Sequence, residues 1–208
     1  MIKKVDILGI QLDNYTVREA IMCVERYLSN NVLNTIESIS LQMLIDSEVN
    51  PVLKEVMSSL DLAIIGEKEI IQAAGLESMQ RIRETEENDF YFEFFKRIER
   101  NKKSVFLLGD TQEKIDSLKA ELTEDYPKLI FAGEYAVETC VGDLEAVIND
   151  MNATTPDVII SVLPSPMQEQ FLYEHRDKMN ANIWYGIGGV PVLSLIHISE
   201  PTRLRRIS

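Results

Sequence analysis

The sequence has few of the residues that build disulfide frameworks and metal sites. Cys23 and Cys140 are its only cysteines, and neither belongs to a C-x-x-C motif. His175 and His197 are its only histidines, too few for a histidine-rich metal site. This scarcity excludes a disulfide-stapled secreted domain, argues against a zinc hydrolase, and fits the reducing cytosol.

Long apolar runs and an excess of positive charge are also missing. No run is long enough for a signal peptide or a membrane span, and Asp6 interrupts the opening segment MIKKVDILGI. Lysine and arginine number 21 against 34 acidic residues, a net charge of −13. Because each phosphate contact in a nucleic acid needs a basic side chain, we expect no nucleic-acid partner. Without a signal peptide or a membrane span, we expect a cytoplasmic protein.

The usual glycine-rich nucleotide motifs are absent. The sequence has neither G-x-G-x-x-G nor G-x-x-x-x-G-K-[ST]. Their absence argues against an NAD-dependent reductase. The segment VFLLGD, residues 105–110, keeps one glycine after an apolar run. Gly109 there fits half of a phosphate loop, and it fits a plain strand-end turn equally well.

The last residues look foreign to the rest of the chain. Residues 193–208 read LSLIHISEPTRLRRIS, which resembles a translated sequencing adapter. They are therefore excluded from the predicted fold, which is a single domain over residues 1–192. Without this tail the net charge becomes −15, and His175 is the sole histidine.

What remains alternates between two kinds of segment. Apolar, β-rich runs predict strands, and amphipathic stretches between them predict helices. We expect an α/β, Rossmann-like fold, a largely parallel sheet with helices on both faces. The predicted strands are residues 5–10, 35–40, 60–65, 104–109, 129–133, 157–163 and 182–188, and the predicted helices are 16–29, 41–59, 69–74, 89–102, 112–126, 144–151 and 167–179.

Local signals refine this outline. Thr16, with Glu19 three residues on, predicts a capping box, and Thr111 predicts a second helix cap. The acidic stretch ETEEND, residues 84–89, predicts an exposed loop because like charges repel. In a parallel sheet, ligands bind at the carboxyl ends of the strands, so the candidate loops begin near Ser40, Gly66, Gly109, Pro164 and Gly186.

Two of these loops carry distinctive residues. VLPSPMQEQF places Gln168 and Glu169 in the first turn of a helix, where helix capping alone would explain the glutamate. YGIGGV gathers Gly188 and Gly189 behind a strand, which permits either close contact with a ligand or a tight turn.

Taken in order and spacing, blocks across residues 4–192 resemble one family. VDILGIQLDNYTVREAI looks like its first strand, turn and helix, and FLLGDTQEKIDSLKAELTEDYPKL like its glycine loop and following helix. PDVIISVLPSPMQEQF is similar to its strand and P-x-Q-E motif, and IWYGIGGV to its G-V-G-G strand end, with Ile187 for valine. The family is WecB/TagA/CpsF, glycosyltransferase family 26.

The resemblance implies an inverting transfer of an N-acetylmannosamine-type sugar, without a metal or other cofactor. The donor would be a UDP-sugar and the acceptor a polyprenyl-diphosphate-linked sugar, in cell-surface polysaccharide or teichoic acid synthesis at the inner face of the plasma membrane. We expect this chain to lack the family's basic C-terminal region, which contacts the membrane, and a homo-oligomer is a further expectation. By resemblance, the residues bordering the donor site are Gly109, Asp110, Gln168, Glu169, Gly188 and Gly189.

The sequence departs from the family where catalysis is expected. Ser38-Ile39-Ser40 stands where the family has Thr-x-Asn, and the two serines are substrate-binding candidates. Gly66-Glu67 replaces the Asp-Gly pair that supplies the presumed general base. Glu67 is then the candidate base, displaced by one residue, although a base must come within about 2.6–3.2 Å of the acceptor oxygen.

A third departure concerns an arginine. Arg81 lies roughly where the family has one, but Glu84 replaces the glycine that follows it. Two functions therefore stay open: an active UDP-sugar transferase with Glu67 as base, or a catalytically inactive relative that binds a nucleotide sugar as a sensor or partner subunit.

Overall fold

The computed structural model describes residues 3–76, 78–140 and 144–189. The predicted foreign tail at 193–208 lies outside these residues, and the single domain over 1–192 stays a prediction. Among the described residues, no helix combines the length and the apolar character needed to cross a membrane.

The strands form one sheet of eight in the order β1-β2-β4-β3-β8-β7-β5-β6. Within the part of the chain that the structure describes, β1 and β2 pair antiparallel and every other pair is parallel. This confirms the predicted α/β, Rossmann-like class. The strands are β1 (Lys4–Ile7), β2 (Ile10–Asp13), β3 (Asn34–Ile39), β4 (Leu62–Ile65), β5 (Ser104–Gly109), β6 (Ile130–Ala136), β7 (Val158–Ser161) and β8 (Ile183–Gly186).

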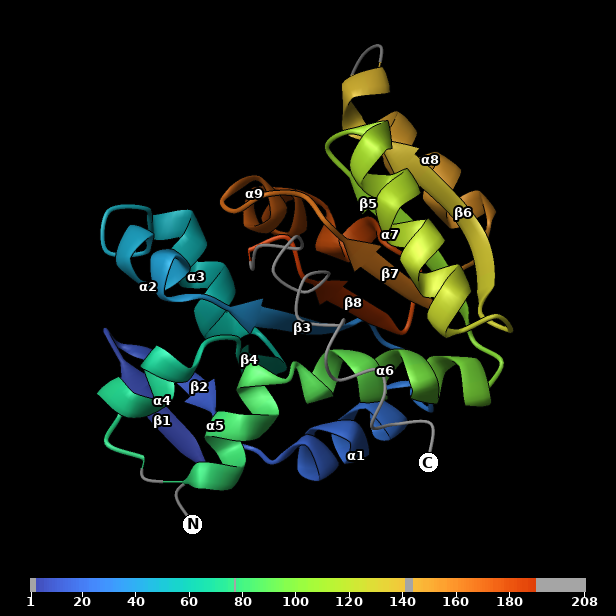
Figure 1. The fold of residues 1–208 in the computed structure, drawn as a ribbon. Coiled ribbons are helices and arrows are strands. Elements are labelled where there is room, and N and C mark those ends of the chain that lie inside the picture. Colours follow the sequence, from blue (N-terminus) through green and yellow to red (C-terminus); the bar gives the residue numbers. More distant parts are fainter. Residues whose placement is uncertain (1–2, 77, 141–143, 190–208) are drawn as a thin grey trace.

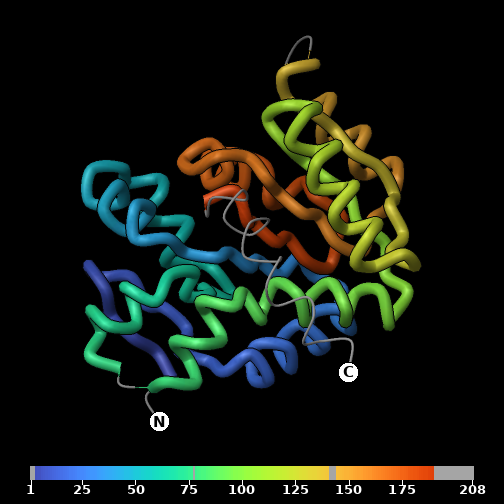
Figure 2. The backbone as a smooth tube through the Cα atoms, in the orientation of Figure 1, coloured from blue at the N-terminus to red at the C-terminus, as the bar shows by residue number. Residues whose placement is uncertain are grey.

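Helices cover both faces of the sheet (Figure 1). On one face lie α1 (Val17–Tyr27), α6 (Asp89–Arg100) and α7 (Gln112–Asp125), with α5 (Met79–Glu86) against α6. The other face carries α2 (Leu41–Asp46), α3 (Pro51–Ser59), α4 (Lys68–Ala73), α8 (Glu145–Ala153) and α9 (Met167–His175). In Figure 2, α3 and α9 lie side by side over the middle of the sheet. Two short 3-10 turns, η1 (Val137–Thr139) and η2 (Arg176–Lys178), follow β6 and α9.

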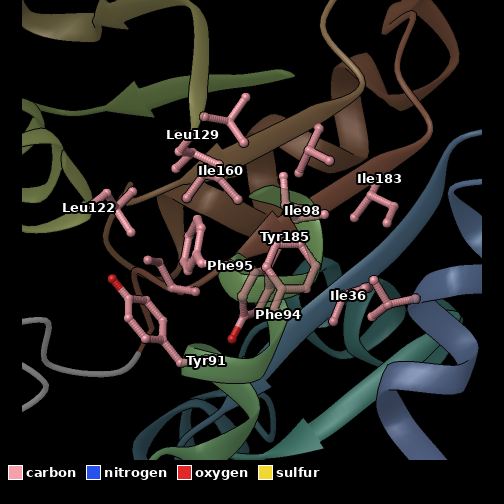
Figure 3. Packing of buried hydrophobic residues seen from close by; sticks show 14 of the residues in the cluster. Ile36, Tyr91, Phe94, Phe95, Ile98, Leu122, Leu129, Ile160, Ile183 and Tyr185 are labelled. Carbon is pink, nitrogen blue, oxygen red and sulfur yellow. The ribbon is translucent and has the colours of Figure 1, made fainter. Parts of the chain in front are cut away.

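The central strands are apolar on both sides because each side meets a helix layer. In β5, Val105 and Leu107 join the cluster under α1, α6 and α7, while Phe106 and Leu108 join the cluster under α8 and α9. Figure 3 shows the first cluster, where the α6 aromatics lie against a strand residue, Phe94 within 4.6 Å of Tyr185 between ring centroids. The aromatic run of α6 is therefore core.

Three predicted boundaries are wrong. The strand predicted at 5–10 is a hairpin, because Leu8 and Gly9 both take positive φ and turn the chain back. The helix predicted at 41–59 is two helices, since Asn50 caps a new helix at its Leu53 amide and Pro51 begins it. Of residues 84–89 only 87 and 88 form a turn, because α5 runs to Glu86 and α6 begins at Asp89.

Both predicted caps are confirmed. Thr16 accepts from the amide of Glu19, whose carboxylate reaches back to the Thr16 amide, a reciprocal capping box. Thr111 accepts from the Lys114 amide at the start of α7. These caps fix two helix starts, the second beside a candidate loop.

Candidate functional site

The loops after β3, β4, β5, β7 and β8 meet at one edge of the sheet. Hydrogen bonds join them in pairs: the Gly66 amide donates to Ile39 O over 2.9 Å, and the Val162 amide donates to Leu108 O over 2.8 Å. The Ile187 amide donates to Ser161 O over 2.9 Å. The loops that carry Gly109 and Gln168 are therefore neighbours, as a shared ligand site requires.

A cleft opens at this edge on the α1, α5 and α6 side. It brings together two predicted site residues, Ser38 and Arg81, with Gly66, which begins one of the candidate loops. The Tyr185 hydroxyl lies in the same cleft, 3.2 Å from the Ser38 hydroxyl. Burial raises the pKa of Tyr185, so its phenol stays protonated at neutral pH and can donate a hydrogen bond. The cleft thus offers hydroxyl donors beside one guanidinium group.

Arg81 is held from two sides inside this cleft. Its Nε donates to Asn14 Oδ1 over 3.3 Å, and its Nη1 donates to Glu84 Oε2 over 3.0 Å. The Arg81 and Glu84 side chains are only 6% and 9% exposed, so the ion pair is largely withdrawn from water. The Glu84 carboxylate also accepts the Val17 amide and the Gln80 amide group. Because Glu84 is paired with Arg81 and accepts these two further hydrogen bonds, the acidic stretch can fold as a helix here.

Glu67 lies next to the cleft but turns away from Arg81. Gly66 lines the cleft, whereas the Glu67 carboxylate accepts the Leu41 amide at the start of α2 over 2.9 Å. Ser40, the N-cap of α2, is buried and accepts the Met43 amide over 3.2 Å. Both side chains therefore accept hydrogen bonds from amides in the first turn of α2. To act as a base, Glu67 has to give up its hydrogen bond to the Leu41 amide.

Gly109 and Asp110 precede α7, where phosphate binding was predicted. A Cβ on Gly109 would lie 2.8 Å from Ile115 and 3.0 Å from Val162, so the glycine permits close packing within the protein. The Glu138 carboxylate accepts the Gln112 amide over 2.7 Å, and Asp110 pairs with Lys114 over 2.6 Å. The Glu138 carboxylate already occupies this helix start, so a diphosphate there would displace it.

Gln168 and Glu169 lie in the first turn of α9, on the opposite face of the sheet from the cleft, and neither is exposed. Gln168 Oε1 accepts the Gly188 amide over 3.2 Å. A Cβ at Gly186 would lie 2.4 Å from Gln168 Nε2, one at Gly188 1.8 Å from Leu163 O, and one at Gly189 2.2 Å from Met43 Sδ. These glycines make room for protein atoms in this structure.

Sequence reasoning missed several residues that shape the cleft. Asn14 orients Arg81, Tyr185 supplies a hydroxyl, and Asn88 lines the cleft in the left-handed conformation between α5 and α6. Tyr185 had a signal, because successive strand residues point to opposite faces of the sheet and Tyr185 therefore faces away from Trp184. Asn14 and Asn88 had none, since long-range packing brings them to Arg81.

Among the described residues, no three histidine, cysteine, aspartate or glutamate side chains are grouped to hold a metal ion. The metal independence expected from the resemblance is a separate matter of mechanism and stays a prediction.

Comparison with known proteins gives consistent matches. The family model described as "Glycosyl transferase WecG/TagA/CpsF family" matches residues 5–195. Curated relatives from Staphylococcus aureus strains NCTC 8325 and COL are each 24% identical over 196 residues, covering 89% of this chain and 73% of the relative. Each is named N-acetylglucosaminyldiphosphoundecaprenol N-acetyl-beta-D-mannosaminyltransferase.

Proposed function

Because this chain belongs to the WecG/TagA/CpsF glycosyl transferase family, we propose that it transfers an N-acetylmannosamine-type sugar from a UDP donor to a polyprenyl-diphosphate-linked acceptor. The named activity of the Staphylococcus aureus relatives supports this sugar and acceptor class. The structural observation that carries the proposal is the cleft that gathers Ser38, Gly66 and Arg81 beside the carboxyl ends of β3, β4 and β8. The product would serve cell-surface polysaccharide or teichoic acid synthesis.

In the proposed reaction an acceptor hydroxyl attacks the anomeric carbon of the donor sugar. A new C–O bond forms as the bond to the UDP oxygen breaks, and UDP departs with the electron pair. Arg81 would stabilise the charge that grows on the leaving diphosphate, with Ser38 and Tyr185 donating hydrogen bonds. Attack from the face opposite UDP inverts the anomeric centre, and no metal takes part in this scheme.

Glu67 would take the proton from the acceptor hydroxyl. It follows the cleft residue Gly66, and its carboxylate would have to leave the Leu41 amide to act as the base. We expect Glu67→Gln to lower turnover by roughly 100-fold, as loss of a general base does, with little change in UDP affinity. Quench-flow assays with UDP-N-acetylmannosamine and a polyprenyl-diphosphate-linked N-acetylglucosamine acceptor measure this. Glu69→Gln, an exposed change in the first turn of α4, is the matched control.

An unchanged rate in Glu67→Gln would show that another group removes the proton. Calorimetry with UDP tests the wider proposal, because a full-length protein without affinity for UDP binds no UDP-sugar. Membrane contact and oligomer formation would be tested separately, by vesicle sedimentation and light scattering.

Two observations favour a second candidate, a nucleotide-sugar-binding relative without turnover. Gly66 stands where the family's presumed base stands, and Glu84 neutralises Arg81 within the cleft. Such a protein would bind UDP and consume no UDP-sugar, acting as a sensor or as a partner of an active transferase. Turnover with the full-length protein separates the two candidates.

A further inference from the structure

Two glutamates meet in the core beneath α9, and the proposed reaction uses neither. Glu37 lies on β3 in the middle of the sheet, Glu169 lies in the first turn of α9, and both are 0% exposed. Gly186 is the register partner of Glu37 in the sheet, and the Gln168 amide group that lies over Gly186 donates to Glu169, so both carboxyl groups border the same amide. Because two ionised carboxylates repel each other in a core that excludes water, we expect one of the two to keep a proton.

The hydrogen-bond partners show which carboxyl carries the proton. Glu169 accepts the Ser165 hydroxyl over 2.9 Å and the Gln168 amide group over 3.2 Å. Glu37 Oε1 accepts the Trp184 indole N–H over 3.4 Å, while Glu37 Oε2 has no donor. Glu169 thus has the better set of donors for a negative charge, and Glu37 Oε2 is satisfied when it bears a proton itself.

The surroundings supply no cation in contact with the pair among the residues that the structure describes. The register neighbours of Glu37 in the sheet are Ala63 and Gly186, which are uncharged. From α3, Lys54 pairs with Glu48 and Glu55 is exposed. At the far end of α9, His175 lies against Phe171, whose ring stacks on Trp184, and its nearest carboxylate is that of Glu174 at 3.7 Å.

The pair also borders the residue that holds the end of β8. Gln168 donates to Glu169, and its amide lies over Gly186, where any Cβ would clash. Its Oε1 accepts the Gly188 amide, and the intervening Ile187 lines the candidate cleft. The Gln168 side chain therefore connects the buried carboxyl groups to the cleft through the backbone of residues 186–188.

We propose that Glu37 and Glu169 share a single proton at neutral pH, and that this neutral-acid and carboxylate pair is a positioning device that fixes Gln168 beneath the end of β8. Its influence on the ligand rests on the proposed function. The shared proton and the positioning of Gln168 do not depend on the proposed function.

Electrostatics support this assignment. Burial, followed by repulsion from Glu169, raises the pKa of Glu37 well above its ordinary value, and burial also raises the pKa of Glu169. The folded protein thus holds a proton that the unfolded chain releases above about pH 4.5. Stability from this source is complete below that pH and falls as the pH rises through the folded pKa of the pair.

Infrared spectroscopy of the full chain tests the shared proton directly. At pH 7 we expect the C=O band of a protonated carboxylic acid, and we expect Glu37→Gln to remove it. Glu55→Gln, an exposed glutamate on α3, should leave the band intact. The absence of such a band in the wild-type protein, or its persistence in Glu37→Gln, overturns the proposal.

Amide exchange at Gly188 tests the positioning. Glu37→Gln keeps a donor for Glu169 and should preserve the Gly188 exchange rate, while Glu37→Leu removes the donor and should speed exchange roughly tenfold. Equal rates in the two variants would overturn the positioning role. If Glu37→Leu does not fold, the infrared result and the pH profile of Glu37→Gln still decide.

That pH profile has a defined sign. Between pH 5 and 8 the melting temperature of the wild type should fall relative to Glu37→Gln, by roughly 2–4 °C for one unit of raised pKa. Parallel profiles would contradict a shared proton. A protein that shows the band and the exchange effect without binding UDP would overturn the proposed function alone.

Discussion

Gly188→Ala is expected to cost about 3 kcal/mol or more of unfolding free energy, because the new methyl group has no space. Its Cβ would lie 1.8 Å from Leu163 O and 2.6 Å from the Leu163 carbonyl carbon. These are backbone atoms of the loop after β7, so no side-chain rotation relieves the overlap. The end of β8 has to move away from that loop, and the bond from the Gly188 amide to Gln168 is lost with it.

Chemical denaturation measures this cost, and the melting temperature should fall by roughly 6–12 °C. Gly75→Ala is the matched control: Gly75 has a positive φ, but no atom lies within 4 Å of the place that an added methyl group would take, so only backbone strain of about 1 kcal/mol is expected. Equal losses in the two variants would mean that the close approach of Leu163 is not what requires glycine at 188.

The glycines at the end of β8 also show which features of the site could be predicted from the sequence. YGIGGV correctly placed a strand end at the ligand-binding edge, because glycine clusters and apolar runs are local signals. Whether a ligand or a protein atom fills the space beside Gly186 and Gly188 depends on Gln168 and Leu163, which lie some twenty residues away in sequence. No local pattern carries that information.

The same limit applies to charge. The stretch 84–89 was predicted as a loop because its acids repel one another, yet Glu84 is buried in a helix. Arg81 on the same helix, the amide of Val17 and the amide group of Gln80 together offset that repulsion. The class of fold could be predicted because strand and helix alternation is a property of neighbours in sequence, whereas strand order and the Arg81 environment arise from distant contacts.

Arg81→Met is expected to be the most damaging single change in the cleft. It leaves the Glu84 carboxylate, 9% exposed, without its cation, which costs about 3–5 kcal/mol. It also removes the guanidinium that would bind the diphosphate, so UDP affinity should be lost. Adding Glu84→Gln to Arg81→Met should restore most of the stability, because no buried charge remains, and none of the affinity. Denaturation and calorimetry on the same samples separate the two effects.

Glu84→Gln alone should act in the opposite direction on the ligand. The glutamine oxygen can still accept from Arg81 and Val17, but the negative charge that neutralises the guanidinium is gone. UDP affinity should therefore rise roughly tenfold, the size of one strong charge-assisted contact. Glu86→Gln is the control, since Glu86 pairs with Lys68 at the surface of the same helix and should change stability by less than about 1 kcal/mol. Weaker UDP binding in Glu84→Gln would contradict this prediction and show that Glu84 orients Arg81 for binding. In that case the glutamate found in place of the family's glycine would favour UDP binding instead of weakening it.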